Sequence, residues 1–136
     1  MIHLNLAIVE DEKEMFERLK SSLTSYFDEN HISFAIDYYP NGEKFLHKYK
    51  PDYDVVFMDI NLPGANGMET IKKLREKDPK VIVIFVTYLA QFAIEGYSVG
   101  AFDYILKPFN DKSLFVTLDR VLCNLNRFSA VIPVGN

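Results

Sequence analysis

The sequence predicts an α/β fold in which five strands build a doubly wound parallel sheet with five helices around it. Short apolar runs alternate five times with segments of helical periodicity, which is the pattern of successive βα units. Residues 81–86 are a continuous run of β-branched and aromatic side chains, typical of a strand buried on both faces. The 136 residues suffice for one domain with a sizeable core.

Three strands and two helices are expected in the first part of the chain. Residues 4–9 are an apolar run that ends at acidic side chains, and residues 33–38 and 54–58 are similar short runs. A helix is predicted over about residues 12–29, because several apolar side chains share one helical stripe: Phe16, Leu19, Leu23, Tyr26 and Phe27. Residues 42–49 are expected to form a short second helix.

The second part of the chain continues the alternation. Its elements are expected at residues 67–77 (helix), 81–86 (strand), 89–98 (helix), 102–106 (strand) and 111–127 (helix). The first of these helices should stop at Asp78, because the following Pro79 disfavours helical backbone before it. The last carries an apolar stripe, and either Asn110 or Asp111 could cap its N-terminus.

Composition excludes several classes of protein. With 49% hydrophobic and 25% charged residues, the chain is neither disordered nor of low complexity. No apolar run approaches the ~20 residues that span a bilayer, and no secretory signal is visible, so we expect no membrane partner. A net charge of −4 argues against direct binding of nucleic acid. The single cysteine, Cys123, cannot form an internal disulfide, which fits a cytoplasmic location.

Reactive side chains follow four of the five predicted strands. The first strand ends at Glu10 and Asp11, the third at Asp59, the fourth at Thr87 and the fifth at Lys107. In an open parallel sheet, ligands bind beyond the carboxyl ends of the strands. Each residue alone has an ordinary explanation, such as first-turn acids that favour a helix N-terminus. Together they predict a site with three carboxylates, a hydroxyl and an amine.

This combination suits a phosphoryl group held next to a divalent cation. Clustered carboxylates repel one another, and Mg²⁺, which prefers oxygen ligands, relieves that repulsion. A lysine can hold a phosphoryl oxygen, and an aspartate can itself be the nucleophile that forms an acyl phosphate. The glycine-rich sequences of nucleotide sites are absent from the chain. The site is therefore expected to carry phosphate on an aspartate without a place for ATP.

Four segments resemble the receiver domain of bacterial two-component response regulators. They are residues 8–12 (Ile-Val-Glu-Asp-Glu), 55–64 (Val-Val-Phe-Met-Asp-Ile-Asn-Leu-Pro-Gly), 85–87 (Phe-Val-Thr) and 103–109 (Asp-Tyr-Ile-Leu-Lys-Pro-Phe). Residues 1–127 are accordingly expected to form a receiver domain. The resemblance implies a flavodoxin-like sheet with strand order 2-1-3-4-5. It also implies that the domain is not an enzyme and that it accepts phosphate from a sensor histidine kinase.

The resemblance assigns roles to the acidic residues at the strand ends. It implies that Asp59 is the phosphoacceptor. It further implies that Asp11, Asp59 and the backbone carbonyl of Asn61 bind Mg²⁺ or Mn²⁺, with Glu10 contributing through water.

The remaining roles concern the phosphoryl group and the switch. The resemblance implies that Lys107 binds a phosphoryl oxygen and that Pro108 follows a cis peptide bond. Thr87 would also bind the phosphoryl group and, together with Tyr104, would form the switch. One position departs from the family pattern, because Tyr88 stands where receivers commonly have a small residue. We expect this ring to hinder attacking water more than Asn61 assists it, and so to prolong the life of the phosphate.

A narrower resemblance concerns the output. Residues 87–109 look like those of receivers that precede a LytTR-type DNA-binding domain. Residues 128–136 are then expected to be a linker or the start of an output domain missing from this chain, and DNA would be bound only through that domain. Tyr97, Phe102 and the final helix are expected to support a phosphorylation-dependent homodimer, although these residues could equally be core.

Three other interpretations remain open. A single-domain phosphorelay receiver would use the same site. A haloacid-dehalogenase-like phosphatase also uses a strand-end aspartate with Mg²⁺. That class requires a general-acid aspartate two residues later, where this chain has Asn61. A flavodoxin-like electron carrier would need a phosphate loop rich in serine and threonine after the first strand, and the sequence has none there.

Overall fold

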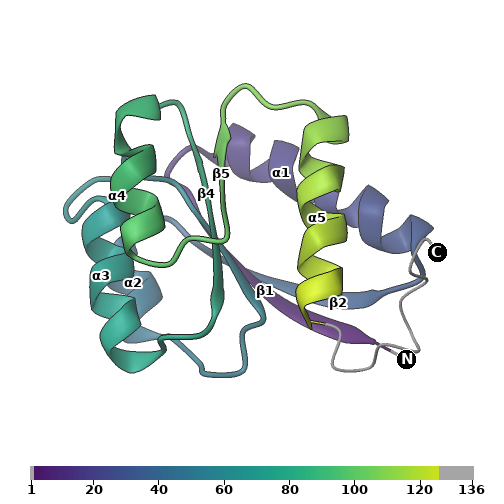
Figure 1. The fold of residues 1–136 in the computed structure, drawn as a ribbon, viewed down its shortest axis with the longest axis horizontal. Helices are drawn as coiled ribbons and strands as arrows, with labels where there is room; N and C mark the ends of the chain where they lie inside the picture. The colour runs from purple at the N-terminus through teal and green to yellow at the C-terminus, as the bar shows by residue number, and fades with distance from the viewer. Residues whose placement is uncertain (1, 126–136) are drawn as a thin grey trace.

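Five parallel strands form the centre of the molecule in the computed structural model, which describes residues 2–125 (Figure 1). The strands are β1 (His3–Val9), β2 (Ser33–Tyr39), β3 (Val55–Met58), β4 (Ile82–Thr87) and β5 (Asp103–Leu106). Their order across the sheet is β2-β1-β3-β4-β5, and every neighbouring pair is parallel. The predicted fold class and strand order are therefore confirmed.

Helices cover both faces of the sheet. They are α1 (Lys13–Glu29), α2 (Gly42–His47), α3 (Gly67–Lys77), α4 (Ala93–Ser98) and α5 (Asp111–Leu125). Figure 1 shows α1 and α5 on one side of the sheet and α2, α3 and α4 on the other. Within residues 2–125, none of the helices combines the length and the apolar character that a membrane-spanning segment needs.

The sheet separates two apolar cores because successive side chains of a strand point to opposite faces. On β1, Leu6 and Ile8 pack with the apolar stripes of α1 and α5. Ala7 and Val9 of the same strand pack with side chains of α2 and α3. The inner strands are covered on both faces, so they need apolar residues at every position, which explains the continuous runs in the sequence.

Two predicted helices differ from the structure. Residues 89–98 were expected to form a single helix, but a 3₁₀ turn, η1 (Ala90–Phe92), precedes the short α4. Only Gly96 of α4 is buried, while Ile94 and Tyr97 are exposed. Periodicity identifies a helix by its apolar stripe, and α4 buries almost none. The predicted helix over residues 42–49 also ends early, at His47.

The turn after β3 is packed tightly against the backbone of Asp59. The amide of Gly67, the first residue of α3, donates to the carbonyl of Ile60 at 2.8 Å. A Cβ atom on Gly67 would lie 2.0 Å from the Asp59 carbonyl oxygen, so only glycine fits there. Asn66 and Glu69 form a capping box at this helix start. The exit of the chain from Asp59 is thereby fixed by backbone contacts.

Candidate functional site

Backbone hydrogen bonds extend beyond the strands to the predicted site residues. The amide of Asp59 donates to the carbonyl of Val9 at 3.0 Å, and the amide of Glu10 donates to the carbonyl of Tyr39 at 3.0 Å. The amide of Lys107 donates to the carbonyl of Thr87 at 2.8 Å. Because each residue is the first after its strand or close to it, the ladder of the sheet places all of them at the same edge.

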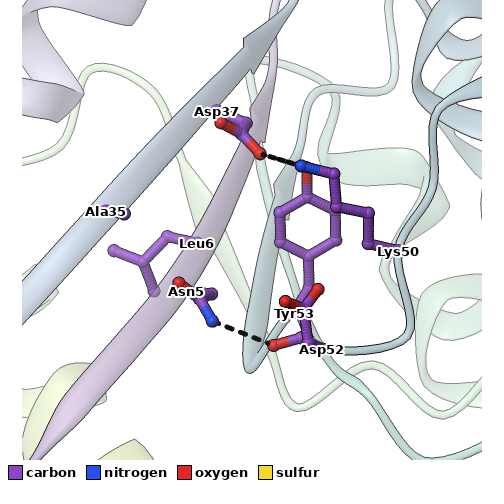
Figure 2. Close-up of a pocket in the computed structure, with 7 residues that line it drawn as sticks. All are labelled: Asn5, Leu6, Ala35, Asp37, Lys50, Asp52 and Tyr53. Carbon is purple, nitrogen blue, oxygen red and sulfur yellow. Dashed lines mark hydrogen bonds and ion pairs between the residues drawn. The ribbon is translucent and has the colours of Figure 1, made fainter.

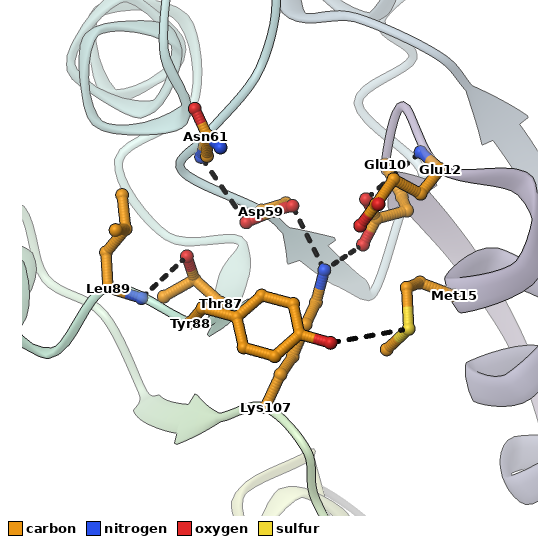
Figure 3. A network of polar contacts seen from close by, with 9 residues as sticks. All are labelled: Glu10, Glu12, Met15, Asp59, Asn61, Thr87, Tyr88, Leu89 and Lys107. Atoms are coloured by element: carbon orange, nitrogen blue, oxygen red, sulfur yellow. Dashed lines mark hydrogen bonds and ion pairs between the residues drawn. The ribbon is translucent and has the colours of Figure 1, made fainter.

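A buried ion pair network lies at the centre of the site (Figure 3). The Lys107 Nζ atom donates to Glu10 Oε1 at 2.5 Å and to Asp59 Oδ2 at 3.1 Å. The Lys107 side chain is only 1% exposed, and the two carboxylates are almost as deeply buried. A charge at such depth is costly unless it is paired, so the three groups hold one another in place.

Burial changes the acid–base properties of this network. Burial raises the pKa of Glu10 from 4.5 to about 7, assisted by the neighbouring charge of Asp59 and opposed by Lys107. Burial alone would lower the pKa of Lys107, but its bonds to Glu10 and the charge of Asp59 outweigh that effect and raise it. The ammonium therefore stays charged, while Glu10 can hold a proton near neutral pH.

Three carboxylates converge as the sequence predicted. Ligand oxygens of Glu10, Asp11 and Asp59 all lie within 4.8 Å of one another, and Asp11 is the exposed member. Such a set of hard oxygen donors, with one side open to water, is the kind that Mg²⁺ and Mn²⁺ prefer. The backbone amide of Asn61 donates to Asp59 Oδ1 at 3.3 Å, so the Asn61 residue also lies beside this cluster.

Thr87 and Tyr104 are linked through one intervening residue. The buried Thr87 Oγ1 atom accepts from the Leu89 amide at 3.3 Å. The Tyr104 hydroxyl donates to the Leu89 carbonyl. The centroid of the Tyr104 ring lies 5.8 Å from that of the Phe85 ring. The two residues assigned to the switch thus contact opposite ends of the same residue.

Tyr88 lies beside the Lys107 ammonium. Its ring centroid is 5.3 Å from the Lys107 ammonium, within the range of a cation–π interaction. Its hydroxyl points to the sulfur of Met15 on α1, at 4.0 Å (Figure 3). The side chain remains 57% exposed. The contact with Met15 could not be predicted from the sequence, because the two residues are far apart along the chain.

Pro108 follows a cis peptide bond, Lys107–Pro108.

A cavity of about 160 Å³ lies away from the site, between the edge strand β2, β1 and the loop before β3 (Figure 2). Its lining includes Asp37, Lys50 and Tyr53, and it contains none of the predicted site residues.

Comparison with known families identifies the domain. The family model "Response regulator receiver domain" matches residues 6–119. The chain belongs to the response regulator receiver family. Among solved receivers, the response regulator protein TrrA from Thermotoga maritima in complex with Mg(2+)-BeF is 29% identical, with a TM-score of 0.75 over 88% of this chain and 99% of that one. The non-phosphorylated HemR receiver domain from Leptospira biflexa is 27% identical, also with a TM-score of 0.75, over 88% and 94%.

Curated relatives are longer than this chain. Sensory transduction protein LytT of Oceanobacillus iheyensis is 32% identical over 87% of this chain and 48% of the relative. Transcriptional regulatory protein CusR of Escherichia coli is 35% identical over 95% of this chain and 54% of the relative. The receiver therefore spans about half the length of these relatives.

We predict that the titration of Glu10 lowers stability as pH rises. Between about pH 4.5 and 7, the metal-free folded chain keeps a proton on Glu10 that the unfolded chain has released. The unfolding free energy should therefore fall as pH is raised through this window. Urea unfolding with a chelator at pH 5 and pH 7 measures the effect.

The matched variants are Glu10→Gln, which removes the titration, and Glu14→Gln on the first turn of α1, which does not. The pH-dependent loss should be smaller in Glu10→Gln than in the parent, and unchanged in Glu14→Gln. An equal loss in all three proteins would contradict the assignment to Glu10.

Proposed function

We propose that this receiver accepts a phosphoryl group on Asp59 from the phosphohistidine of a sensor histidine kinase. The observation that supports this most is the position of Asp59, which is buried at the strand edge with one oxygen 3.1 Å from the Lys107 ammonium. An aspartate next to a fixed cation and two more carboxylates suits phosphoryl transfer, which depends mainly on positioning and charge stabilisation.

The transfer would make one bond and break another. A carboxylate oxygen of Asp59 attacks the phosphorus in line, and the bond between phosphorus and the donor imidazole nitrogen breaks. The nitrogen leaves with the bonding electron pair, and the product is an acyl phosphate on Asp59. The Lys107 ammonium offsets negative charge on the phosphoryl oxygens.

The carboxylate cluster fits a divalent cation as cofactor. Asp11, Asp59 and the Asn61 backbone carbonyl would hold Mg²⁺ or Mn²⁺, with Glu10 acting through water. When bound, the ion would neutralise charge on the carboxylates and the incoming phosphoryl oxygens. The related TrrA receiver, solved with Mg(2+)-BeF, supports this assignment.

The link from Thr87 to Tyr104 provides a route to the surface. A phosphoryl group on Asp59 would offer the Thr87 hydroxyl an acceptor, and movement of Oγ1 toward it would alter the bond that Oγ1 accepts from the Leu89 amide. Leu89 also accepts from Tyr104, so a shift at one bond would bias the other. We infer that phosphorylation alters η1, α4 and β5 through this residue.

The output is proposed to be transcription, through a DNA-binding domain outside this chain. Among the relatives, CusR is a transcriptional regulatory protein and LytT is a sensory transduction protein. A LytTR-type output stays a prediction, and so does its linker, because residues 128–136 lie outside the described residues.

The first prediction from this proposed function concerns the phosphoacceptor. Incubation with acetyl phosphate and Mg²⁺ should add one phosphate to the parent, and Asp59→Asn should gain none, because an amide cannot form the acyl phosphate. Intact mass measures the product, and omission of the divalent ion should slow the reaction. Asp52→Asn, at an exposed position of the loop before β3, is the control. Equal labelling of Asp59→Asn would contradict the proposal.

The second prediction concerns the lifetime of the phosphate. Tyr88→Ala should lose phosphate faster than the parent, because the ring over Lys107 hinders water that approaches in line. Phosphate release after removal of the donor gives the rate. Tyr97→Ala is a matched control, since both tyrosines are 57% exposed but Tyr97 lies on α4. A decay in Tyr88→Ala that is equal to or slower than the parent's would refute the lifetime proposal.

Exposed apolar side chains favour a homodimer through α4, β5 and α5. Ile94 is 87% exposed, and Tyr97, Leu106 and Val116 are about half exposed, on three consecutive elements of the chain. Phe102, which the sequence placed on the same face, is only partly exposed and packs on the core beneath Arg120. We propose that a second copy covers these side chains after phosphorylation.

The third prediction tests this dimer. Sedimentation of the parent with Mg²⁺ and beryllofluoride, a phosphoryl mimic, should show a dimer that is absent without the mimic. Ile94→Asp should abolish the dimer, because it places a charge where apolar surface is buried. His47→Asp adds the same charge on α2 and should leave the dimer intact. A parent that stays monomeric under both conditions would remove the proposal.

A further inference from the structure

Outside the site, a guanidinium on α1 contacts the turn between β5 and α5. Arg18 Nη2 donates to the Phe109 carbonyl at 3.1 Å, and its Cζ atom lies 5.0 Å from the centroid of the Phe109 ring. Arg18 Nη1 donates to Asp111 Oδ1 at 3.1 Å and to Ser22 Oγ at 2.9 Å. One side chain therefore contacts both the connecting segment, at Phe109, and the first residue of α5, Asp111.

The contact with Asp111 has a second, buried component. Ser22 Oγ donates to the same Asp111 oxygen at 2.7 Å, and Ser22 is only 2% exposed. These bonds, first from Ser22 and then from Arg18, lower the pKa of Asp111, which keeps it ionised. A single exposed ion pair contributes little to geometry. Here the planar guanidinium of Arg18, the buried hydroxyl of Ser22 and the ring of Phe109 together hold the turn in one position.

This turn directly follows Lys107. The Lys107 amide donates to the Thr87 carbonyl, so the sheet holds the residue on one side. Phe109, two residues later, is held on the other side by Arg18. Both hydrogen bonds hold the backbone on either side of Lys107, and neither involves its ammonium group.

We propose that Arg18 is a positioning residue that keeps Lys107 in place for the phosphoryl group. The inference rests on the proposed function of Asp59 and Lys107. On phosphorylation, Asp59 ceases to be a free carboxylate, and Lys107 must exchange that partner for a phosphoryl oxygen. The contacts that fix Lys107 before transfer thus change during it. The Arg18 contacts lie outside the site and persist, so the Lys107 backbone keeps its place while its ammonium changes partner.

The test compares two arginines in matched surroundings. Arg120 lies 3.1 Å from Asp103 Oδ2 and 4.9 Å from the Phe102 ring centroid, and its side chain is 54% exposed against 45% for Arg18. Arg18→Gln and Arg120→Gln therefore remove similar ion pairs and cation–π contacts. Titration with Mg²⁺ alone, and with beryllofluoride at saturating Mg²⁺, separates the metal ligands from the groups that hold the phosphoryl mimic.

Arg18→Gln should weaken beryllofluoride binding about tenfold, because a small displacement of a charged group costs much of its interaction. Its Mg²⁺ affinity should match the parent's, since Asp11 and Asp59 are untouched. Arg120→Gln should retain both affinities. Arg18→Lys should not restore the parent affinity, because an ammonium lacks the two separate Nη groups with which the guanidinium reaches Phe109 and Asp111 together.

Each opposite result has a distinct meaning. If Arg18→Gln binds beryllofluoride like the parent, or if Arg120→Gln is equally weakened, the positioning role of Arg18 is refuted. An equal loss of Mg²⁺ affinity in Arg18→Gln would reveal general loosening of the fold and would also refute it. If the parent itself does not bind beryllofluoride, the proposed function of the site fails.

Discussion

The Lys107 ammonium lies almost entirely out of water, between two carboxylates that are almost as deeply buried. Removing these charges from water is unfavourable, and their mutual attraction offsets the desolvation penalty only when the geometry is fixed. Each charge comes from a different strand end, so the network can form only if β1, β3 and β5 are in register. Glu10, Asp11 and Asp59 bring three carboxylates beside one ammonium, that of Lys107. This excess of negative charge is the basis for the proposed cation binding and phosphoryl transfer.

The parallel sheet satisfies this requirement through its backbone. Hydrogen bonds from Glu10, Asp59 and Lys107 continue the ladder past the strands, so the side chains need no long loops to meet. The tight fit of Gly67 against the Asp59 carbonyl fixes the next turn of the chain. In contrast, α4 buries only Gly96 and lies beside the Leu89 contacts. The rigid part of the fold carries the acceptor, and the loosely packed part faces the surface proposed as the dimer face.

The sequence was sufficient for the sheet and for the residues at its carboxyl edge. Buried strands need unbroken apolar runs, so the first polar residue after each run, such as Asp59 or Thr87, can be identified directly. The 3₁₀ start of the 89–98 segment could not be predicted, because Leu89 and Phe92 are only partly buried against one core and Ile94 and Tyr97 are exposed, so the segment has no clear apolar stripe. Contacts such as Tyr88 with Met15 and Arg18 with Phe109 also could not be predicted. They depend on the angle at which a helix crosses the sheet, and no local pattern encodes that angle.

Two sets of contacts consequently join the first helix to the end of the fifth strand. Inside the site, Glu10, just before α1, holds the Lys107 ammonium; outside it, Arg18 on α1 holds the turn that follows Lys107. The inner contact involves a group that must change partner when Asp59 is modified. The outer contact involves groups that do not react. A switch needs both, because a lysine whose backbone moved with its ammonium would transmit the change into the core instead of along Thr87, Leu89 and Tyr104.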